Sequence, residues 1–348
     1  MSRTCVLGAG SWGTTLAVHL ANLGHDVAIW GNVRAELEAM ERDRENRKFL
    51  AGIPLPDRIK VQPELEVALR GADLTVFVVP SVAVREVGEA VRKTGARSLW
   101  VSAAKGLEPT TFERMSEVLG EAVGEKRVVV MTGPSHAEEV SRGVPTSIVA
   151  ASGNEADARM VQTTFSSPTL RVYTNDDVVG CEIGAALKNV IAIAAGVCDG
   201  VGYGDNTKGA LLTRGLAEIS RLGVAMGGRR ETFFGLTGMG DLITTAMSRH
   251  SRNRHVGERL GKGETLEQVL GAMWMVAEGV NTARAARDLG RKHGVEMPIT
   301  EQVCAMLFEA KAPKEALGAL MSRDLKREVE TAGSLPKAGA AVAKRREP

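Results

Sequence analysis

The feature that most constrains the fold is a glycine-rich turn near the N-terminus, which follows a short apolar segment and leads into an amphipathic one. Residues 8–13 read Gly-Ala-Gly-Ser-Trp-Gly, and residues 12–23 carry apolar side chains at helical spacing. In a strand-turn-helix unit, the first glycine permits the tight turn, the second lets backbone N–H groups approach a pyrophosphate, and the third lets the helix pack on the strand. The helix N-terminus adds partial positive charge. The pattern predicts a dinucleotide site formed by Gly8, Gly10, Ser11, Trp12 and Gly13.

The rest of the chain divides into two patterns. In the first half, strand-like runs alternate with helical stretches, which predicts an α/β fold with a Rossmann-like, doubly wound, mostly parallel sheet. From about residue 177 the strand-like runs disappear and apolar residues recur at helical spacing, so an all-helical C-terminal domain is expected. We therefore expect an NAD(P)-binding domain over 1–177, a helical substrate-binding and catalytic domain over 178–332 and a flexible basic tail over 333–348. The predicted strands are 4–7, 27–30, 74–79, 99–102, 128–131 and 146–151.

Composition excludes several classes of function. A net charge of +2 on 348 residues gives no basic field for nucleic acid, so the expected partner is a small molecule. The four cysteines are scattered without a Cys-x-x-Cys pair, which indicates reduced thiols and no metal site. The first strand begins too early for a signal peptide, and the apolar stretch 190–198 is too short to cross a bilayer. A cytoplasmic protein without an integral membrane segment is expected.

The residues after the second predicted strand bear on which dinucleotide binds. An acidic residue about 20 residues past the glycine turn favours NAD, because its carboxylate accepts hydrogen bonds from the ribose hydroxyls. This chain has Gly31-Asn32-Val33-Arg34 there. With no carboxylate to repel a 2′-phosphate and an arginine close by, the site admits NADP as well as NAD. In the alternative interpretation, Arg34 only begins a solvated helix over residues 34–47.

Lys188 is the most unusual single residue for chemistry. Its helical neighbours, three and four residues away, are Gly184, Ala185, Ile191 and Ala192, so its ammonium group lies on a small, apolar face. Burial would lower its pKa, and such a lysine can exchange a proton with a substrate hydroxyl. The alternative is a lysine that extends from a partly buried helix to solvent.

Two segments that follow predicted strands carry further candidate groups. Lys105 would place a second ammonium at the sheet edge, or it is an ordinary turn lysine. Gly133-Pro134-Ser135 offers backbone N–H groups and a hydroxyl to ligand oxygens. The same segment also fits a helix start, with Ser135 as the cap and Glu138 as its capping-box partner.

A third segment lies in the helical half. Asp241 follows a glycine turn, where it caps a helix or takes part in the site. Arg252 lies between Ser251 and Asn253, a combination suited to a phosphate because a guanidinium forms bidentate charge-assisted bonds and its neighbours reach the remaining oxygens. The alternative is a polar surface loop.

Taken together, these residues resemble the bacterial NAD(P)-dependent glycerol-3-phosphate dehydrogenases over nearly the whole chain, from Gly8 to about residue 330. Each motif alone is short, and the set is specific. The matching motifs lie at residues 8–13, 104–107, 133–140, 187–190, 240–242, 251–253 and 278–280.

The resemblance implies reversible hydride transfer between sn-glycerol 3-phosphate and dihydroxyacetone phosphate, a reaction that supplies phospholipid synthesis. It implies that Lys188 is the acid and base on the C2 oxygen, that Lys105 contacts substrate and cofactor, and that Asp241 orients both lysines. Further substrate contacts are implied for Gly133, Ser135, Asn189, Ser251, Arg252 and Asn253. Further cofactor contacts are implied for Arg34, a looser match, and for Ala137, Arg252, Val276 and Glu278.

Two other functions compete with this one. A β-hydroxyacid dehydrogenase of the 6-phosphogluconate type also joins a dinucleotide domain to a helical domain with a lysine, but it fits residues 251–253 less well. A non-catalytic dinucleotide-binding sensor would gain nothing from a desolvated Lys188. The helical half is rich in small residues that fit a homodimer face.

Overall fold

The computed structural model describes residues 2–273, 275–325 and 327–328. Its sheet has eight strands in the order β3-β2-β1-β4-β5-β6-β7-β8, and every neighbouring pair is parallel except β6 and β7. This order confirms the Rossmann-like, mostly parallel sheet. The strands are β1 (Arg3–Leu7), β2 (Asp26–Trp30), β3 (Ile59–Val61), β4 (Leu74–Phe77), β5 (Leu99–Ser102), β6 (Val128–Thr132), β7 (Thr146–Ala151) and β8 (Leu170–Asn175).

All six predicted strands are present, and β3 and β8 were missed. β3 has three residues, too few to give a sequence pattern. β8 is an edge strand in which buried Leu170 and Val172 alternate with exposed residues, so it shows no continuous apolar run.

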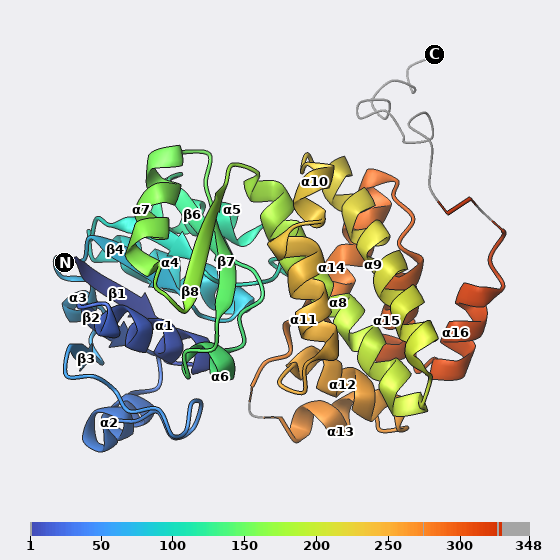
Figure 1. The fold of residues 1–348 in the computed structure, drawn as a ribbon, viewed down its shortest axis with the longest axis horizontal. Coiled ribbons are helices and arrows are strands. Elements are labelled where there is room, and N and C mark those ends of the chain that lie inside the picture. Colours follow the sequence, from blue (N-terminus) through green and yellow to red (C-terminus); the bar gives the residue numbers. More distant parts are fainter. Residues whose placement is uncertain (1, 274, 326, 329–348) are drawn as a thin grey trace, which may run out of the picture.

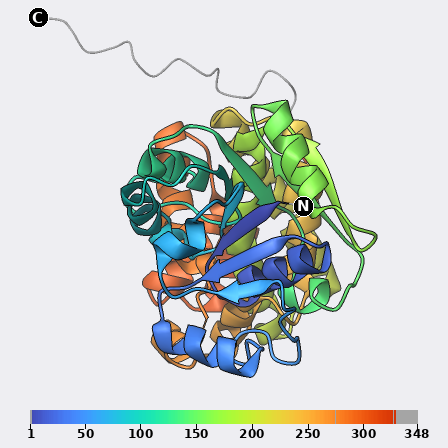
Figure 2. The ribbon, with the colours of Figure 1, turned by 90° about the vertical axis from the view of Figure 1, so that its left-hand side faces the viewer.

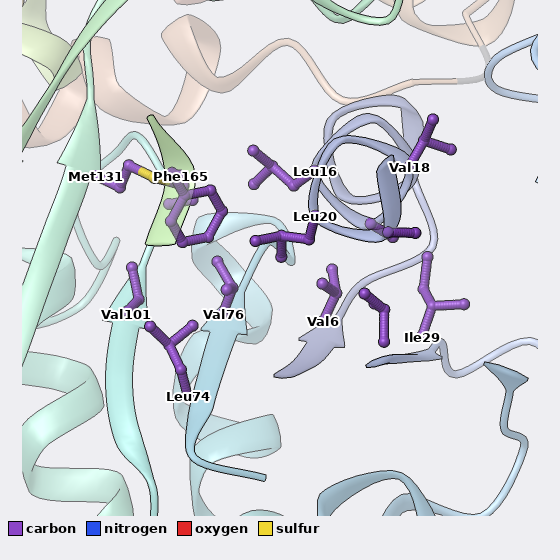
Figure 3. Close-up of a cluster of buried hydrophobic side chains, with 14 of the residues drawn as sticks. Val6, Leu16, Val18, Leu20, Ile29, Leu74, Val76, Val101, Met131 and Phe165 are labelled. Atoms are coloured by element: carbon purple, nitrogen blue, oxygen red, sulfur yellow. The ribbon is translucent and has the colours of Figure 1, made fainter. Parts of the chain in front are cut away.

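Helices cover the sheet and join its strands (Figures 1 and 2). Leu16 and Leu20 lie among Val6, Val76 and Phe165 in the apolar core between the sheet and its covering helices (Figure 3). Full burial of each such side chain contributes about 1.5–3 kcal/mol to folding. The helices of this sheet region are α1 (Ser11–Asn22), α2 (Arg34–Asp43), α3 (Leu65–Leu69), the 3₁₀ turn η1 (Ser81–Ala83), α4 (Val84–Lys93), α5 (Met115–Val123), α6 (Ala137–Val140) and α7 (Glu155–Phe165).

The change from strands to helices falls between Asn175 and Val178, and we propose to divide the chain into domains there. The helical region lies beside the sheet region in Figure 1, and the predicted tail over 333–348 lies outside the described residues. The helical elements are α8 (Val178–Val201), α9 (Asp205–Ala225), α10 (Arg230–Phe233), the π turn η2 (Leu236–Gly240), α11 (Asp241–Met247), α12 (Arg252–Gly261), α13 (Leu266–Gly271), α14 (Glu278–His293), α15 (Pro298–Phe308) and α16 (Pro313–Met321).

Helix α8 is the centre of the helical region. By length and composition alone, α8 is long and apolar enough to cross a membrane. The apolar segment is therefore longer than the stretch 190–198, which by itself is too short to cross a bilayer. Its most apolar 18-residue window is, however, 89% buried inside the fold. No other helix in the described part of the chain passes the same test. The apolar character of α8 is thus accounted for by its packing at the core of the helical region.

Helices α8 and α12 approach each other at glycines. A Cβ atom on Gly257 would lie 1.9 Å from the Ile193 carbonyl oxygen, and one on Gly196 would lie 1.9 Å from the Arg254 carbonyl oxygen. Both distances are far shorter than a van der Waals contact, so only glycine fits at either position. The two backbones therefore touch, which fixes α12 rigidly against α8.

Candidate active site

The glycine turn has the geometry that a pyrophosphate requires. Gly8 has φ of +121°, and a Cβ there would lie 2.6 Å from the Val78 carbonyl oxygen. Gly13 lets α1 approach the turn so closely that a Cβ would lie 1.8 Å from the Gly8 carbonyl oxygen. At Gly10, the N-cap of α1, a Cβ would meet nothing within 4 Å, and no side chain caps the helix. The first N–H groups of α1, which begins at Ser11, are thus left for an anionic ligand.

Trp12 and Arg34, the two larger side chains predicted near this turn, differ in their exposure to solvent. Trp12 is partly buried against the core of the sheet region. Arg34 begins α2, as the alternative interpretation had it, although this helix ends at Asp43 and not near residue 47. Its side chain is 69% exposed and pairs with Glu38 and Glu64 at 3.0 and 3.4 Å. An exposed arginine at the start of α2, four residues after β2, can still turn toward a ribose phosphate.

A largely buried cluster of two lysines and one aspartate lies where the sheet and helical regions meet. Lys188 on α8 pairs through Nζ with Asp241 Oδ1 at 3.0 Å and donates to Thr245 Oγ1 at 2.6 Å. Lys105, which follows β5, pairs with the other oxygen of the carboxylate at 2.9 Å. Asp241 begins α11 and is 2% exposed. One carboxylate therefore holds both ammonium groups, as the resemblance implies.

The lysine on α8 does not extend to solvent, because Lys188 is only 5% exposed. Burial lowers its pKa to about 8, an effect that Asp241 opposes and that the charges of Lys105 and Arg252 strengthen. Burial alone would raise the pKa of Asp241, but the two lysines outweigh it and hold this pKa below its usual value. The cluster thus combines an ionised carboxylate with a lysine close to neutrality.

The loop after β6 adds oxygen atoms to this cluster. Lys105 Nζ donates to the Gly133 carbonyl oxygen at 2.7 Å and to Ser135 Oγ at 3.2 Å. Ser135 donates in turn to Gly133 at 2.9 Å. The capping-box alternative for Ser135 is wrong, because α6 begins at Ala137 with His136 as its N-cap and without a side-chain cap. The Ser135 hydroxyl is instead committed to the lysine.

The segment over 251–253 is not a surface loop. Ser251 is the N-cap of α12, and its hydroxyl accepts from the Arg254 N–H at 3.1 Å. Asn253 is buried; it donates to Asn189 Oδ1 and accepts from the Gly279 N–H, both at 2.9 Å. These bonds join α12 to α8 and α14.

Arg252 is the exposed member of this segment, at the first position of α12. The positive charge of Arg252 lowers the pKa of Lys188. The negative charges of Glu278 and Glu138 attract the Arg252 guanidinium. A guanidinium beside the free N–H groups of a helix start is a favourable place for a phosphate. The structure therefore places this group beside the lysine cluster.

The remaining predicted cofactor contacts are Glu278, Ala137 and Val276. Glu278 begins α14 and accepts hydrogen bonds from the N–H and hydroxyl of Ser81, at 3.0 and 2.5 Å. Ala137 is buried, and its carbonyl accepts from Thr15 of α1 at 3.3 Å. Val276 is 41% exposed. Of these residues, Glu278 joins the helical region to the sheet region, through a protein group that the sequence did not predict.

Three residues of the junction were not singled out from the sequence: Thr245, Glu182 and Ser81. Thr245 follows Asp241 by four residues, so helical spacing could have indicated that it joins the same cluster. It donates to Asp241 Oδ1 at 3.1 Å. Glu182 and Ser81 make contacts with residues far away in the chain, which no local pattern indicates.

Comparison with known proteins identifies the family. The model for the NAD-dependent glycerol-3-phosphate dehydrogenase N-terminus matches residues 3–158, and the model for its C-terminus matches residues 177–318. The chain belongs to the glycerol-3-phosphate dehydrogenase family. The resemblance seen in its motifs is thereby confirmed.

Relatives within the glycerol-3-phosphate dehydrogenase family match almost end to end. Glycerol-3-phosphate dehydrogenase [NAD(P)+] of Chlorobium limicola is 51% identical over 93% of this chain and 98% of its own. The Desulfitobacterium hafniense protein of the same name is 49% identical over 95% of this chain and 94% of its own. The crystal structure of glycerol-3-phosphate dehydrogenase from Coxiella burnetii superposes with a TM-score of 0.89 at 35% identity, covering 92% of this chain and 99% of that one.

Proposed function

We propose that Lys188, held by Asp241 and Thr245, is the acid and base of a glycerol-3-phosphate dehydrogenase reaction. As a member of its family, the chain is an NAD(P)-dependent oxidoreductase that interconverts sn-glycerol 3-phosphate and dihydroxyacetone phosphate. This activity supplies glycerol 3-phosphate for phospholipid synthesis. The observation that carries the assignment of roles is the pairing of buried Lys188 and partly buried Lys105 with one buried carboxylate.

The proposed roles follow from charge and proton balance. The nicotinamide, when bound, supplies or accepts the hydride at C2. Protonated Lys188 gives a proton to the C2 oxygen as the ketone is reduced, and neutral Lys188 removes it as the alcohol is oxidised. Lys105 adds positive charge near the oxygen that becomes an alkoxide, and burial strengthens that attraction. Asp241 keeps the two ammonium groups in place, although they repel each other.

The residues for the dinucleotide are proposed from the fit of the turn. Gly8, Gly10, Gly13 and the start of α1 at Ser11 would hold the pyrophosphate, with Trp12 beside it. Lys105, Ala137, Arg252, Val276 and Glu278 are the further candidates around the junction. At the end of β2, Asn32 and Arg34 stand where a carboxylate would repel a 2′-phosphate, so both NAD and NADP are accepted.

The substrate phosphate is proposed to lie at the start of α12, against Arg252 and near Ser251 and Asn253. Asn189 supports Asn253 from α8. Gly133 and Ser135 would hold the opposite end of the substrate, beside Lys105. The substrate would thus span the junction between the sheet and helical regions.

Arg252→Ala should raise the KM for dihydroxyacetone phosphate by about tenfold to a hundredfold, because a charge-assisted hydrogen bond contributes about 1.5–3 kcal/mol. The value of kcat should change less, since the phosphate is bound equally before and during hydride transfer. Steady-state kinetics with Arg230→Ala, an exposed arginine on α10, provide the matched control. An unchanged KM would remove Arg252 from the phosphate site.

The function itself is tested by mixing the protein with dihydroxyacetone phosphate and either NADH or NADPH and following the loss of nicotinamide absorbance. We expect oxidation of both cofactors, because no carboxylate at the end of β2 rejects NADPH. In a parallel reaction, 6-phosphogluconate with NAD or NADP should give no reduction. Failure to oxidise either reduced cofactor would contradict the proposed function.

A homodimer and a cytoplasmic location are further proposals, supported by the small residues of the helical region and by the scattered reduced cysteines. All four cysteines are buried and unpaired. Sedimentation of the purified protein addresses the first proposal.

A further inference from the structure

Glu182 forms a buried contact between the two regions of the molecule that the reaction scheme does not use. It lies on α8 and is 5% exposed. Its carboxylate accepts from the Ser116 N–H at 2.8 Å, the Ser116 hydroxyl at 2.6 Å and the Arg114 guanidinium at 2.5 Å. Arg114 and Ser116 belong to the start of α5 in the sheet region. One carboxylate of the helical region is therefore held by three donors of the sheet region.

The same carboxylate is close in the chain to Lys188. Six residues separate them on α8, which is about 9 Å along the helix axis. Cys181, near the start of α8, also packs against Val130 of β6 and against Val149 and Ala151 of β7. The N-terminal end of α8 is thus fixed to the sheet region, and less than two turns further on the helix presents Lys188 to Asp241.

The donors of Glu182 are also linked to Lys105. Residues 103–114 form the loop between β5 and α5, and the loop is closed by a bridge between Leu107 and Arg114. The Glu108 N–H donates to the Glu113 carbonyl at 3.0 Å, which supports the bridge. Leu107, two residues after Lys105, is buried in the apolar core of the helical region. A displacement of Arg114 would therefore move the segment that carries Lys105.

We propose that Glu182 is a positioning residue that sets the separation of Lys188 and Lys105 by clamping α8 to the start of α5. This inference rests on the proposed function. Without the clamp, α8 and the 103–114 loop can shift relative to each other, and the two lysines no longer meet the same carboxylate. A misplacement of about 1 Å at a reacting group can cost about a hundredfold in rate.

The helical region offers a matched control in Glu218. This carboxylate on α9 is fully buried and accepts from the Ile299 N–H, the Thr300 N–H and the Thr300 hydroxyl at 2.8, 2.9 and 2.7 Å. Like Glu182, it holds the start of another helix, here α15, through backbone N–H groups and a hydroxyl. Both of its partners, however, lie within the helical region, so its loss affects stability without releasing the sheet region.

The experiment compares Glu182→Gln with Glu218→Gln at saturating dihydroxyacetone phosphate and NADPH. We expect Glu182→Gln to lower kcat by about tenfold to a hundredfold, and Glu218→Gln to change it less than about twofold, while both lower Tm. In Glu182→Gln the pH at which kcat falls should also move higher, because Lys105, whose charge lowers the pKa of Lys188, and His136 move away with the sheet region, whereas Asp241 on α11 and Arg252 on α12 stay beside α8. Loss of folded protein alone would lower the rate without moving this pH.

A second pair of variants keeps the proposal testable if Glu182→Gln does not fold. Ser116→Ala removes only the hydroxyl donor, and Ser116→Thr retains it. We expect a lower kcat in the first and recovery in the second. Wild-type kcat and pH dependence in Ser116→Ala, or equal losses in Glu182→Gln and Glu218→Gln, would overturn the proposal. Failure of the proposed function is distinct, since wild-type protein would then oxidise neither cofactor.

Discussion

Replacing Lys188 with alanine is expected to lower kcat by at least about a hundredfold, the lower end for loss of acid–base catalysis. Lys188 is the buried group with a pKa of about 8, so it can both give and take a proton near neutral pH. Lys188→Arg should be similarly impaired, because a guanidinium does not release its proton. The measurement is the initial rate of NADPH oxidation at saturating dihydroxyacetone phosphate.

The control for this prediction is binding of the dinucleotide. NADPH binding, followed by fluorescence titration, should be nearly the same in Lys188→Ala as in wild type, since the glycine turn lies on β1 and α1. A loss of kcat of only a few-fold, with binding intact, would return Lys188 to a structural role.

Asp241→Asn is the second change with a large expected effect. The carboxylate uses Oδ1 for Lys188 and Thr245 and Oδ2 for Lys105, whereas an amide replaces one acceptor by a donor that faces an ammonium group. The two lysines then repel each other without compensation and separate. We expect kcat to fall by about a hundredfold through this misplacement.

The pH dependence provides an independent check of the same change. In wild type, kcat for reduction should fall as pH rises through about 8, because Lys188 must be protonated to act as the acid. Asp241 raises the pKa of Lys188, so its removal lowers this pKa and moves the fall to lower pH. Asp288→Asn, a half-buried carboxylate on α14 that pairs with Arg287, should leave the profile where it is. If Asp241→Asn leaves the pH profile of kcat unchanged, the roles assigned to Asp241 and Lys188 are contradicted.

Local patterns predicted the parts of the site that depend on neighbouring residues. The turn over 8–13 needs only glycines at set positions between a strand and a helix, and the apolar face around Lys188 follows from helical spacing. The predicted alternation of strands and helices was confirmed for the same reason, because buried parallel strands give continuous apolar runs.

Contacts between distant residues were beyond local patterns. Asp241 is 136 residues from Lys105, and no spacing rule joins them; their association came from the family resemblance. Ser135 fitted a capping box in sequence, but the structure gives its hydroxyl to Lys105. Glu182 lies in an apolar helix where a buried charge requires partners, yet those partners are on α5, about 70 residues earlier in the chain.

The contact of α8 and α12 at Gly196 and Gly257 has a consequence for which molecules are turned over. Lys188 is on one of these helices and Arg252 begins the other, so their separation is set by main chain against main chain and not by adjustable side chains. With the substrate phosphate at the start of α12, as proposed, this fixed helix pair would select ketones by the length of the carbon chain between phosphate and carbonyl. A ketone whose phosphate is one methylene further from its carbonyl would then bind at α12 with its carbonyl oxygen displaced from Lys188.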